Sequence, residues 1–279
     1  MSGGDGLAAG MGGQYIEPMS SPTPPNDAHP GKRTAASRPA RLWRSLLATA
    51  AWPCEVCGSW AGDGLCGDCR RRFAEPWPAC CPRCALPGPG GQVCGACLRQ
   101  PPVFEGCVAA VPYAFPWDRL VARLKFQAQP ELAGLLGDLM QRALARPRTG
   151  PFLPAVQCVL PVPLSPARLA ERGYNQAWEL ARRLARRQGL PARADLLLRL
   201  RDTPHQVGLS RPERERNLRD AMWVDPQAGS VAGLQLALVD DVLTTGGTAT
   251  AATLALRAAG AAGVQVWVLA RTPAPADAS

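Results

Sequence analysis

The stretch from Leu236 to Thr248 reads LALVDDVLTTGGT and places two acids between an apolar run and a turn of threonines and glycines. The apolar residues up to Val239 predict a strand buried on both faces of a parallel sheet. The next segment, TATAATLALRAAGAAG, predicts a helix of small residues. The loop therefore lies between a strand end and a helix start, where free backbone N–H groups and the helix dipole favour an anion.

The residues of this loop suit a phosphate group. Glycines let the backbone approach an anion closely, and threonine hydroxyls can donate further hydrogen bonds. We predict a phosphate cradle of five residues, Thr244, Thr245, Gly246, Gly247 and Thr248.

The acids Asp240 and Asp241 add a second kind of recognition, because carboxylates repel phosphate but accept hydrogen bonds from sugar hydroxyls. A ligand with a 5-phosphate and free ribose hydroxyls matches both halves of the stretch. A nucleoside triphosphatase strand would need a G-x-x-x-x-G-K-[ST] loop, which the sequence lacks, and no Rossmann G-x-G-x-x-G follows a predicted strand. A glycine-rich turn with solvated acids is the remaining alternative.

With this order of apolar residues, acids, threonines and glycines, the stretch resembles the loop of type I phosphoribosyltransferases that binds phosphoribosyl pyrophosphate (PRPP). The resemblance implies that Asp240 and Asp241 contact the ribose 2- and 3-hydroxyls. It also implies that Thr244 to Thr248 hold the 5-phosphate. It does not name the acceptor.

Two arrays of cysteine pairs precede this region, each with C-x2-C spacing. Two such pairs supply four thiolates, which suits tetrahedral zinc in a structural site without an open position for catalysis. One or two ions are expected, with pairing within each array preferred to interleaved pairing. A disulfide framework is the alternative, although such frameworks belong mostly to small secreted domains. The predicted metal ligands are Cys54, Cys57, Cys66 and Cys69, followed by Cys81, Cys84, Cys94 and Cys97.

Length and composition limit the organisation of the chain. Its 279 residues allow one sizeable core and a smaller module, and no hydrophobic span of membrane length is visible, so we expect a soluble, cytoplasmic protein. The net charge of +9 is carried almost wholly by arginine, which makes Lys125 in RLKF conspicuous, although an ordinary surface lysine is the alternative. The predicted regions are a disordered tail over 1–40, a short amphipathic helix with the cysteine arrays over 41–104, a phosphoribosyltransferase-like domain over 105–272 and a second tail over 273–279.

Strands and helices alternate after the cysteine arrays, so the predicted fold class is α/β with a mainly parallel sheet. We expect one long or broken helix over 117–146 and a helix that ends at Gln188 before Gly189. One sheet of at least five strands is predicted, with strands over 106–113, 157–162, 196–200, 235–239 and 264–270.

Two further loops follow predicted strands, at the edge where open α/β sheets bind ligands. The first contains Val162 and Pro163, which we assign to ligand binding, and leads to Ser165, which we predict to cap a helix that carries Arg168 and Arg172.

The second loop, RDTPHQVGLSRPERERN over 201–217, is too long for a mere connection and is predicted to act as a lid. A solvated charged loop is the alternative. The lid residues would be Arg201, Gln206, Arg211, Arg214, Arg216 and Asn217.

Two cysteine arrays, RLKF, VPLSPARLAERGYNQ, the 201–217 loop and VDDVLTTGGT, in this order, resemble the ComF family over about 42–272. The resemblance implies a phosphoribosyltransferase fold, PRPP binding with Mg2+, structural zinc and a role in natural transformation. The implied partners are PRPP, incoming single-stranded DNA and a competence helicase or recombination-mediator protein.

We predict a transfer of ribose 5-phosphate from PRPP, in which the protein stabilises separating charges. The residues assigned to this role are Asp240, Asp241, Lys125, Arg168 and Arg172. A binding module for single-stranded DNA or a partner protein, which keeps the PRPP pocket as a sensor, is the main alternative. A base-salvage enzyme is a third, but no segment clearly supplies a base-binding loop.

Overall fold

The structure is a computed structural model that describes residues 52–75, 78–147, 153–200 and 222–273. The chain divides into two compact units, Met1–Ala48 and Thr49–Ser279, and every described residue lies in the second. The predicted tail over 1–40 and the predicted lid over 201–217 lie outside the described residues. None of the described helices is long and apolar enough to cross a membrane.

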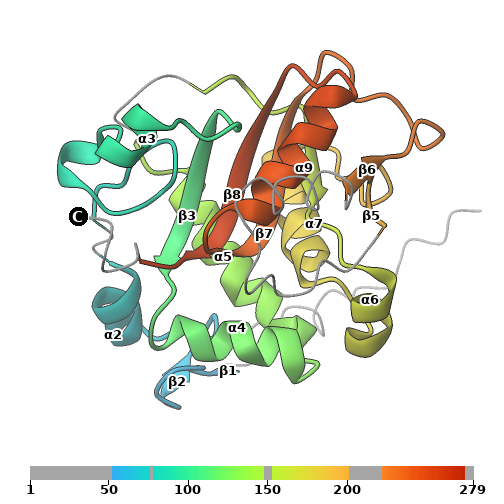
Figure 1. The fold of residues 1–279 in the computed structure, drawn as a ribbon. Helices are drawn as coiled ribbons and strands as arrows, with labels where there is room; N and C mark the ends of the chain where they lie inside the picture. The colour runs from blue at the N-terminus through green and yellow to red at the C-terminus, as the bar shows by residue number, and fades with distance from the viewer. Residues whose placement is uncertain (1–51, 76–77, 148–152, 201–221, 274–279) are drawn as a thin grey trace, which may run out of the picture. The chain divides into compact units, whose positions relative to one another are not determined.

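A four-stranded sheet forms the centre of the described chain (Figure 1). All of its neighbouring strands pair in parallel, in the order β3-β8-β7-β4. The α/β class with a mainly parallel sheet is therefore confirmed. The strands are β3 (Gly106–Pro112), β4 (Cys158–Pro161), β7 (Gln235–Leu243) and β8 (Gly263–Arg271).

Both faces of the sheet are covered, as the apolar runs predict. In β7, Ala237 and Val239 face the core shared with helices α4, α5 and α7, whereas Leu236 and Leu238 face the core shared with α9 and strands β5 and β6. The helices are α4 (Trp117–Phe126), α5 (Ala133–Leu144), α6 (Pro166–Arg172), α7 (Gln176–Gln188) and α9 (Gly247–Ala258).

The predicted long helix over 117–146 is broken. Helix α4 ends at Phe126, Ala128 takes a left-handed conformation with φ of 49°, and the 3-10 turn η3 (Pro130–Leu132) leads into α5. Proline cannot donate to the preceding turn, so the break falls where Pro130 interrupts the helical pattern. Helix α7 ends before Gly189, as predicted.

The predicted strand over 196–200 does not belong to the central sheet, which corrects the expectation of at least five strands. Strand β5 (Leu197–Arg199) instead pairs antiparallel with β6 (Met222–Val224) in a separate sheet. The position beside β4 is taken only by a single bridge between Ala192 and Val159. Pro191, which has no N–H group, precedes that bridge, so this segment cannot extend a regular ladder.

The cysteine arrays fold as short elements against the same body. Trp52 and Pro53, directly before the first array, form strand β1. Indole Nε1 of Trp117 donates to the carbonyl of Phe73 at 3.1 Å, which ties the first array to α4. The remaining elements are β2 (Trp60–Ala61), α2 (Gly67–Cys69), the π-helical turn η1 (Arg70–Ala74), η2 (Pro89–Gly91) and α3 (Gly95–Arg99).

Candidate functional site

The two acids lie within strand β7 and not after its end, because β7 continues to Leu243. Asp240 pairs with Val268 and Leu243 with Arg271 of the neighbouring strand β8. Asp240 is half-buried and Asp241 is buried, with only 3% of its surface exposed. A carboxylate so deep in the protein requires a compensating partner.

Lys125 is that partner. Its ammonium Nζ lies 2.9 Å from Oδ1 of Asp241, at the last turn of α4. The second oxygen, Oδ2, is buried and has no hydrogen-bond partner among the described residues. The two residues that sequence analysis singled out separately therefore meet, and one buried oxygen remains for a ligand hydroxyl or cation.

Asp240 has a strongly altered acidity. Burial and the neighbouring charge of Asp241 raise the pKa of Asp240 to about 8, although Lys125 and the backbone N–H of Asp241 act in the opposite direction. That N–H donates to Oδ1 of Asp240 at 2.8 Å. Near neutral pH this carboxyl group therefore retains its proton and can donate as well as accept a hydrogen bond.

The loop between β7 and α9 presents helix N–H groups without a side-chain cap. Gly246 occupies the N-cap position with φ of +85°, a left-handed conformation that glycine adopts without strain, and no side chain accepts from the first turn. Thr244 and Thr245 are exposed, whereas Gly247 and Thr248 are half-buried. The first turn of α9 thus has the geometry that favours an anion.

The segment RGYNQ holds the end of α4 against this sheet edge. The hydroxyl of Tyr174 donates to the carbonyl of Leu124, directly before Lys125. Nδ2 of Asn175 donates to the carbonyl of Val162 at 3.0 Å, while its Oδ1 caps α7. Sequence analysis quoted this segment but gave no role to Tyr174 or Asn175. The only sign of their role in the sequence is that they lie between two segments predicted to be functional.

Arg172, the last residue of α6, lies against the last residue of α4, Phe126. Its guanidinium carbon is 5.0 Å from the ring centroid of Phe126, and NH1 donates to Oε1 of Gln176 at 3.1 Å. Its Nε is buried and has no hydrogen-bond partner in the described part of the chain. Arg168 is half-buried in α6, and its backbone N–H donates to Oγ of Ser165, so the predicted cap is present.

The loop after β4 lies next to the acid pair. The N–H of Val162 donates to the carbonyl of Val239 at 2.8 Å, one residue before Asp240. Val162 and Pro163 are both buried. The structure therefore brings the predicted ligand residues of both described loops to one edge of the sheet, whereas those of the lid lie outside the described residues.

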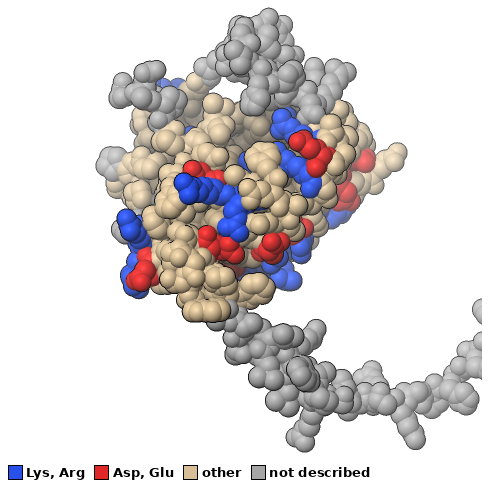
Figure 2. Space-filling model, turned by 90° about the horizontal axis from the view of Figure 1, so that it is seen from below, with Lys and Arg blue, Asp and Glu red and all other residues tan. Residues whose placement is uncertain are grey.

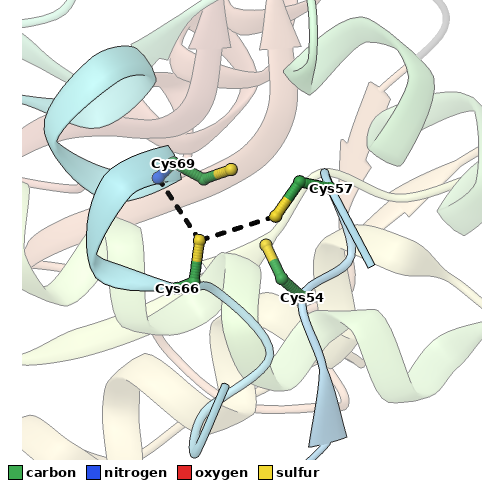
Figure 3. Close-up of side chains that lie close together, drawn as sticks. All are labelled: Cys54, Cys57, Cys66 and Cys69. Atoms are coloured by element: carbon green, nitrogen blue, oxygen red, sulfur yellow. Dashed lines mark hydrogen bonds between the residues drawn. The ribbon is translucent and has the colours of Figure 1, made fainter. Parts of the chain in front are cut away.

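Each cysteine array closes on itself, so the preferred pairing within arrays is the one observed. All four sulfurs of each group lie within 4.8 Å of one another, and Figure 3 shows the side chains of the first group pointing toward a common centre. The sulfurs of Cys57 and Cys66 are 3.6 Å apart, and those of Cys84 and Cys94 are 3.7 Å apart. Sulfurs at roughly 2.3 Å from a tetrahedral zinc ion would be about 3.8 Å apart. The residues therefore fit zinc.

Backbone amides support anionic sulfur in these groups. Burial alone would raise the pKa of Cys81, but donation from the N–H groups of Cys94, Cys84 and Arg83 lowers this pKa to about 7. Donation from Ser59 similarly lowers the pKa of Cys57 to about 6. Burial, with the neighbouring sulfurs, instead raises the pKa of Cys84 to about 12 and also raises the pKa values of Cys69 and Cys97. Thiolates are the form that binds metal, so without an ion only part of each group is in this form.

Comparison with known proteins connects these features. The chain is similar to the DNA utilization protein YhgH of Salmonella typhi, with 35% identity over 79% of this chain and 96% of that protein. It is also similar to competence protein F of Haemophilus influenzae, with 34% identity over 76% of this chain and 92% of that protein. No protein-family model matches the chain.

Two solved structures of phosphoribosyl chemistry also resemble it. One is the glutamine PRPP amidotransferase from B. subtilis complexed with ADP and GMP, at 20% identity and a TM-score of 0.32 over 50% of this chain and 26% of that chain. The other is the adenine phosphoribosyltransferase from Leishmania tarentolae, at 22% identity and a TM-score of 0.29 over 50% of this chain and 56% of that chain. These TM-scores are too low to carry an argument about the ligand.

Proposed function

This chain belongs to the ComF family, which includes the DNA utilization protein YhgH and competence protein F, and we propose that it binds PRPP with Mg2+ and acts in the handling of incoming DNA. The names of the relatives support the DNA role. The sheet edge described above supports the ligand.

One observation carries the proposal for PRPP. Asp241 is buried and uses one oxygen for Lys125, while its other oxygen has no partner among the described residues and lies close in sequence to the uncapped start of α9. A buried oxygen without a partner is costly in a protein that has no ligand for it. A ribose hydroxyl satisfies this oxygen while a 5-phosphate occupies the N–H groups of the loop.

The remaining charges suit the pyrophosphate group. Arg172 and Arg168 approach from α6, and Lys125 is held at the acid pair. The oxygens of Asp241, and those of Asp240 once its proton is displaced by the metal, are ligands of the kind that Mg2+ prefers. Bound Mg2+ would neutralise the charge on the pyrophosphate oxygens. In the proposed transfer, the bond between pyrophosphate and the anomeric carbon breaks and pyrophosphate leaves. A nucleophilic atom of the acceptor then bonds to the anomeric carbon and loses its proton.

Calorimetry of PRPP binding in the presence of Mg2+ tests the ligand. The wild-type protein should release or absorb heat at a single site, and Asp241→Asn should weaken binding by about tenfold or more because a charged acceptor is lost. Asp138→Asn is a matched control, since Asp138 of α5 also pairs with a cation, Arg187 of α7, but away from the acid pair. Zinc-loaded, folded wild-type protein that gives no heat would overturn the proposal.

Turnover is a separate question with its own readout. We expect pyrophosphate release from PRPP when the correct acceptor is present, and a panel of bases, amines and oligonucleotides covers the acceptor classes. PRPP binding without release for any member would favour the sensor function over the transferase.

A second candidate function, binding of single-stranded DNA, is favoured by a ladder of cations and rings near the first array. The guanidinium of Arg72 lies 5.3 Å from the Phe73 ring, Phe73 meets Phe115 edge to face at 5.5 Å, and Arg119 lies 5.0 Å from the Phe115 ring. Phe115 is 51% exposed. Rings with adjacent cations suit stacked bases and their phosphates.

Most other charges near this ladder are paired. Figure 2 shows acidic side chains beside basic ones on the face that carries α2 and α4. Arg71 pairs with Asp68 and Arg70 with Asp63, whereas Arg72 and Arg119 have no carboxylate partner among the described residues. The unpaired cations are therefore the ones available to phosphates.

Arg71 and Arg72 form a matched pair for a test. Arg72→Ala should weaken binding of a short oligothymidylate and reduce the salt dependence of its affinity by about one phosphate contact, whereas Arg71→Ala should change both much less. Equal effects of the two variants would show a diffuse attraction and would argue against this surface.

A further inference from the structure

We propose that Arg271 positions the phosphate loop by tying it to the second cysteine cluster, so that the metal state of this cluster controls the loop. The effect on PRPP affinity rests on the proposed function, whereas the effect on the loop itself does not. Arg271 was not among the residues that sequence analysis selected.

Arg271 is the last residue of β8, and its guanidinium bridges two segments far apart in sequence. On one side, Nε donates to the carbonyl of Cys84 at 3.0 Å. On the other, NH1 donates to the carbonyl of Leu243 at 2.9 Å and to that of Thr244 at 2.5 Å. One guanidinium group therefore bonds both to the start of the phosphate loop and to a cysteine of the second cluster.

The planar peptide gives these bonds a directional consequence. In a trans peptide the carbonyl oxygen and the following N–H group point in opposite directions. Because Arg271 holds the Thr244 oxygen, the N–H of Thr245 must point away from Arg271. A carbonyl oxygen turned toward the anion would repel it, so the bond keeps the loop in the orientation that presents donors.

The other end of this connection, at Cys84 of the second cluster, is also held in place. The sulfur of Cys84 lies 3.7 Å from that of Cys94, and the N–H of Ala85 donates to the carbonyl of Cys81 at 2.9 Å. A metal ion on the four sulfurs fixes the Cys84 side chain and therefore limits the movement of its carbonyl. Without the ion, Arg271 loses a rigid anchor on one side.

The first cluster is connected differently. Glu55, between its first two cysteines, pairs with Arg123 of α4 at 2.7 Å. Among the described residues, the bonds between the segment of the first array and the sheet body reach α4 and Arg146 after α5, and not the phosphate loop. The two clusters therefore form an internal comparison, in which only the second is tied to the loop through Arg271.

Amide hydrogen exchange of residues 244–248 tests the positioning role without any ligand. Exchange should accelerate in Arg271→Gln and also in Arg271→Lys, because an ammonium retains the charge but not the planar fork that reaches both sides. Arg257→Gln on α9, which breaks an exposed ion pair between Arg257 and Glu105, should leave the exchange of residues 244–248 unchanged. Unchanged exchange in folded Arg271→Gln protein would overturn the proposal.

A double-mutant cycle tests the role of the metal. Cys94→Ser and Cys66→Ser remove the third ligand of the second and first clusters, respectively. The effects of Cys94→Ser and Arg271→Gln on loop exchange should be strongly non-additive, because both interrupt the same connection, whereas those of Cys66→Ser and Arg271→Gln should add. Additivity in both pairs would overturn the coupling.

Zinc release from the wild-type protein gives a further readout that needs no cysteine variant. Coupling is reciprocal, so saturating PRPP should slow the loss of one of two zinc ions to a chelator, and Arg271→Gln should abolish that protection. Arg271→Gln should also weaken PRPP binding by roughly tenfold. Wild-type protein that binds PRPP with no protection of zinc contradicts the coupling, whereas wild-type protein that binds no PRPP contradicts the proposed function.

Discussion

At the scale of single residues, the site is dominated by charge buried at the end of β7. Asp241 is compensated by Lys125 through one oxygen only, and Asp240 remains beside it with a pKa raised to about 8. A carboxyl group whose pKa is raised in this way by burial and a neighbouring acid is typical of functional sites, and it costs stability. The cost is measurable.

Asp240→Asn should stabilise the protein more at pH 8 than at pH 5. Because the pKa of Asp240 in the folded state is raised from 3.8 to about 8, the folded protein holds the extra proton between these values, and stability decreases as pH rises through this window. The slope is at most about 1.4 kcal/mol per pH unit. Urea unfolding of both proteins at the two pH values measures the difference. A stability difference between the two proteins that does not change with pH would contradict the shift.

At the scale of elements, the site depends on how α4 and the second cysteine array are held against the sheet. Tyr174 fixes the carboxyl end of α4 through the Leu124 carbonyl, and Gly106 at the start of β3 approaches the carbonyl of Pro82. Both contacts join segments that are distant in sequence. Removing the hydroxyl of Tyr174 breaks the first contact, and adding a methyl group at Gly106 disturbs the second.

Tyr174→Phe should cost about 1 kcal/mol of stability and weaken PRPP binding, because the end of α4 that carries Lys125 loses its anchor. Burial raises the pKa of Tyr174, so the hydroxyl keeps the proton that it donates. Tyr113→Phe is the control, since Tyr113 is exposed and its hydroxyl has no hydrogen-bond partner among the described residues. Equal PRPP affinities of the two variants would remove Tyr174 from the positioning of the site.

Gly106→Ala should destabilise the protein by about 1–3 kcal/mol, because an added Cβ would lie 2.9 Å from the backbone oxygen of Pro82. Gly137→Ala is the matched control in helix α5, where the added Cβ would be 3.8 Å from the nearest side-chain atom. The control should be neutral or slightly stabilising, because alanine favours a helix. Thermal unfolding of both variants with zinc present separates the clash from a general effect of the substitution.

At the scale of the whole molecule, the cysteine arrays are part of the body that carries the site. Leu65 and Ala74 of the first array share a buried cluster with Trp117 of α4, and Ala85 of the second array shares one with Val266 of β8. The predicted boundary between regions 41–104 and 105–272 stays a prediction. Loss of either metal ion is expected to affect packing against the sheet.

Metal analysis of the purified protein should give two zinc ions per chain, and Cys66→Ser or Cys94→Ser should each reduce this to one. Removal of zinc by a chelator should lower the thermal midpoint, since metal binding contributes directly to the folding free energy of such modules. A single ion in the wild-type protein, or a midpoint that ignores the chelator, would contradict two structural sites.

The amino-acid sequence by itself determined the strand, loop and helix of residues 235–258, the two cysteine arrays and the parallel α/β class. These features follow from residue periods and spacings that repeat within a few turns of backbone, so no distant segment is needed to recognise them. Only the tertiary structure decided that Lys125 meets Asp241, that Arg271 joins Cys84 to the phosphate loop, and that residues 197–199 leave the central sheet. The physical reason is that such pairs depend on strand order and chain crossings, and the entropy of closing a long loop depends too weakly on its length to select one partner over another.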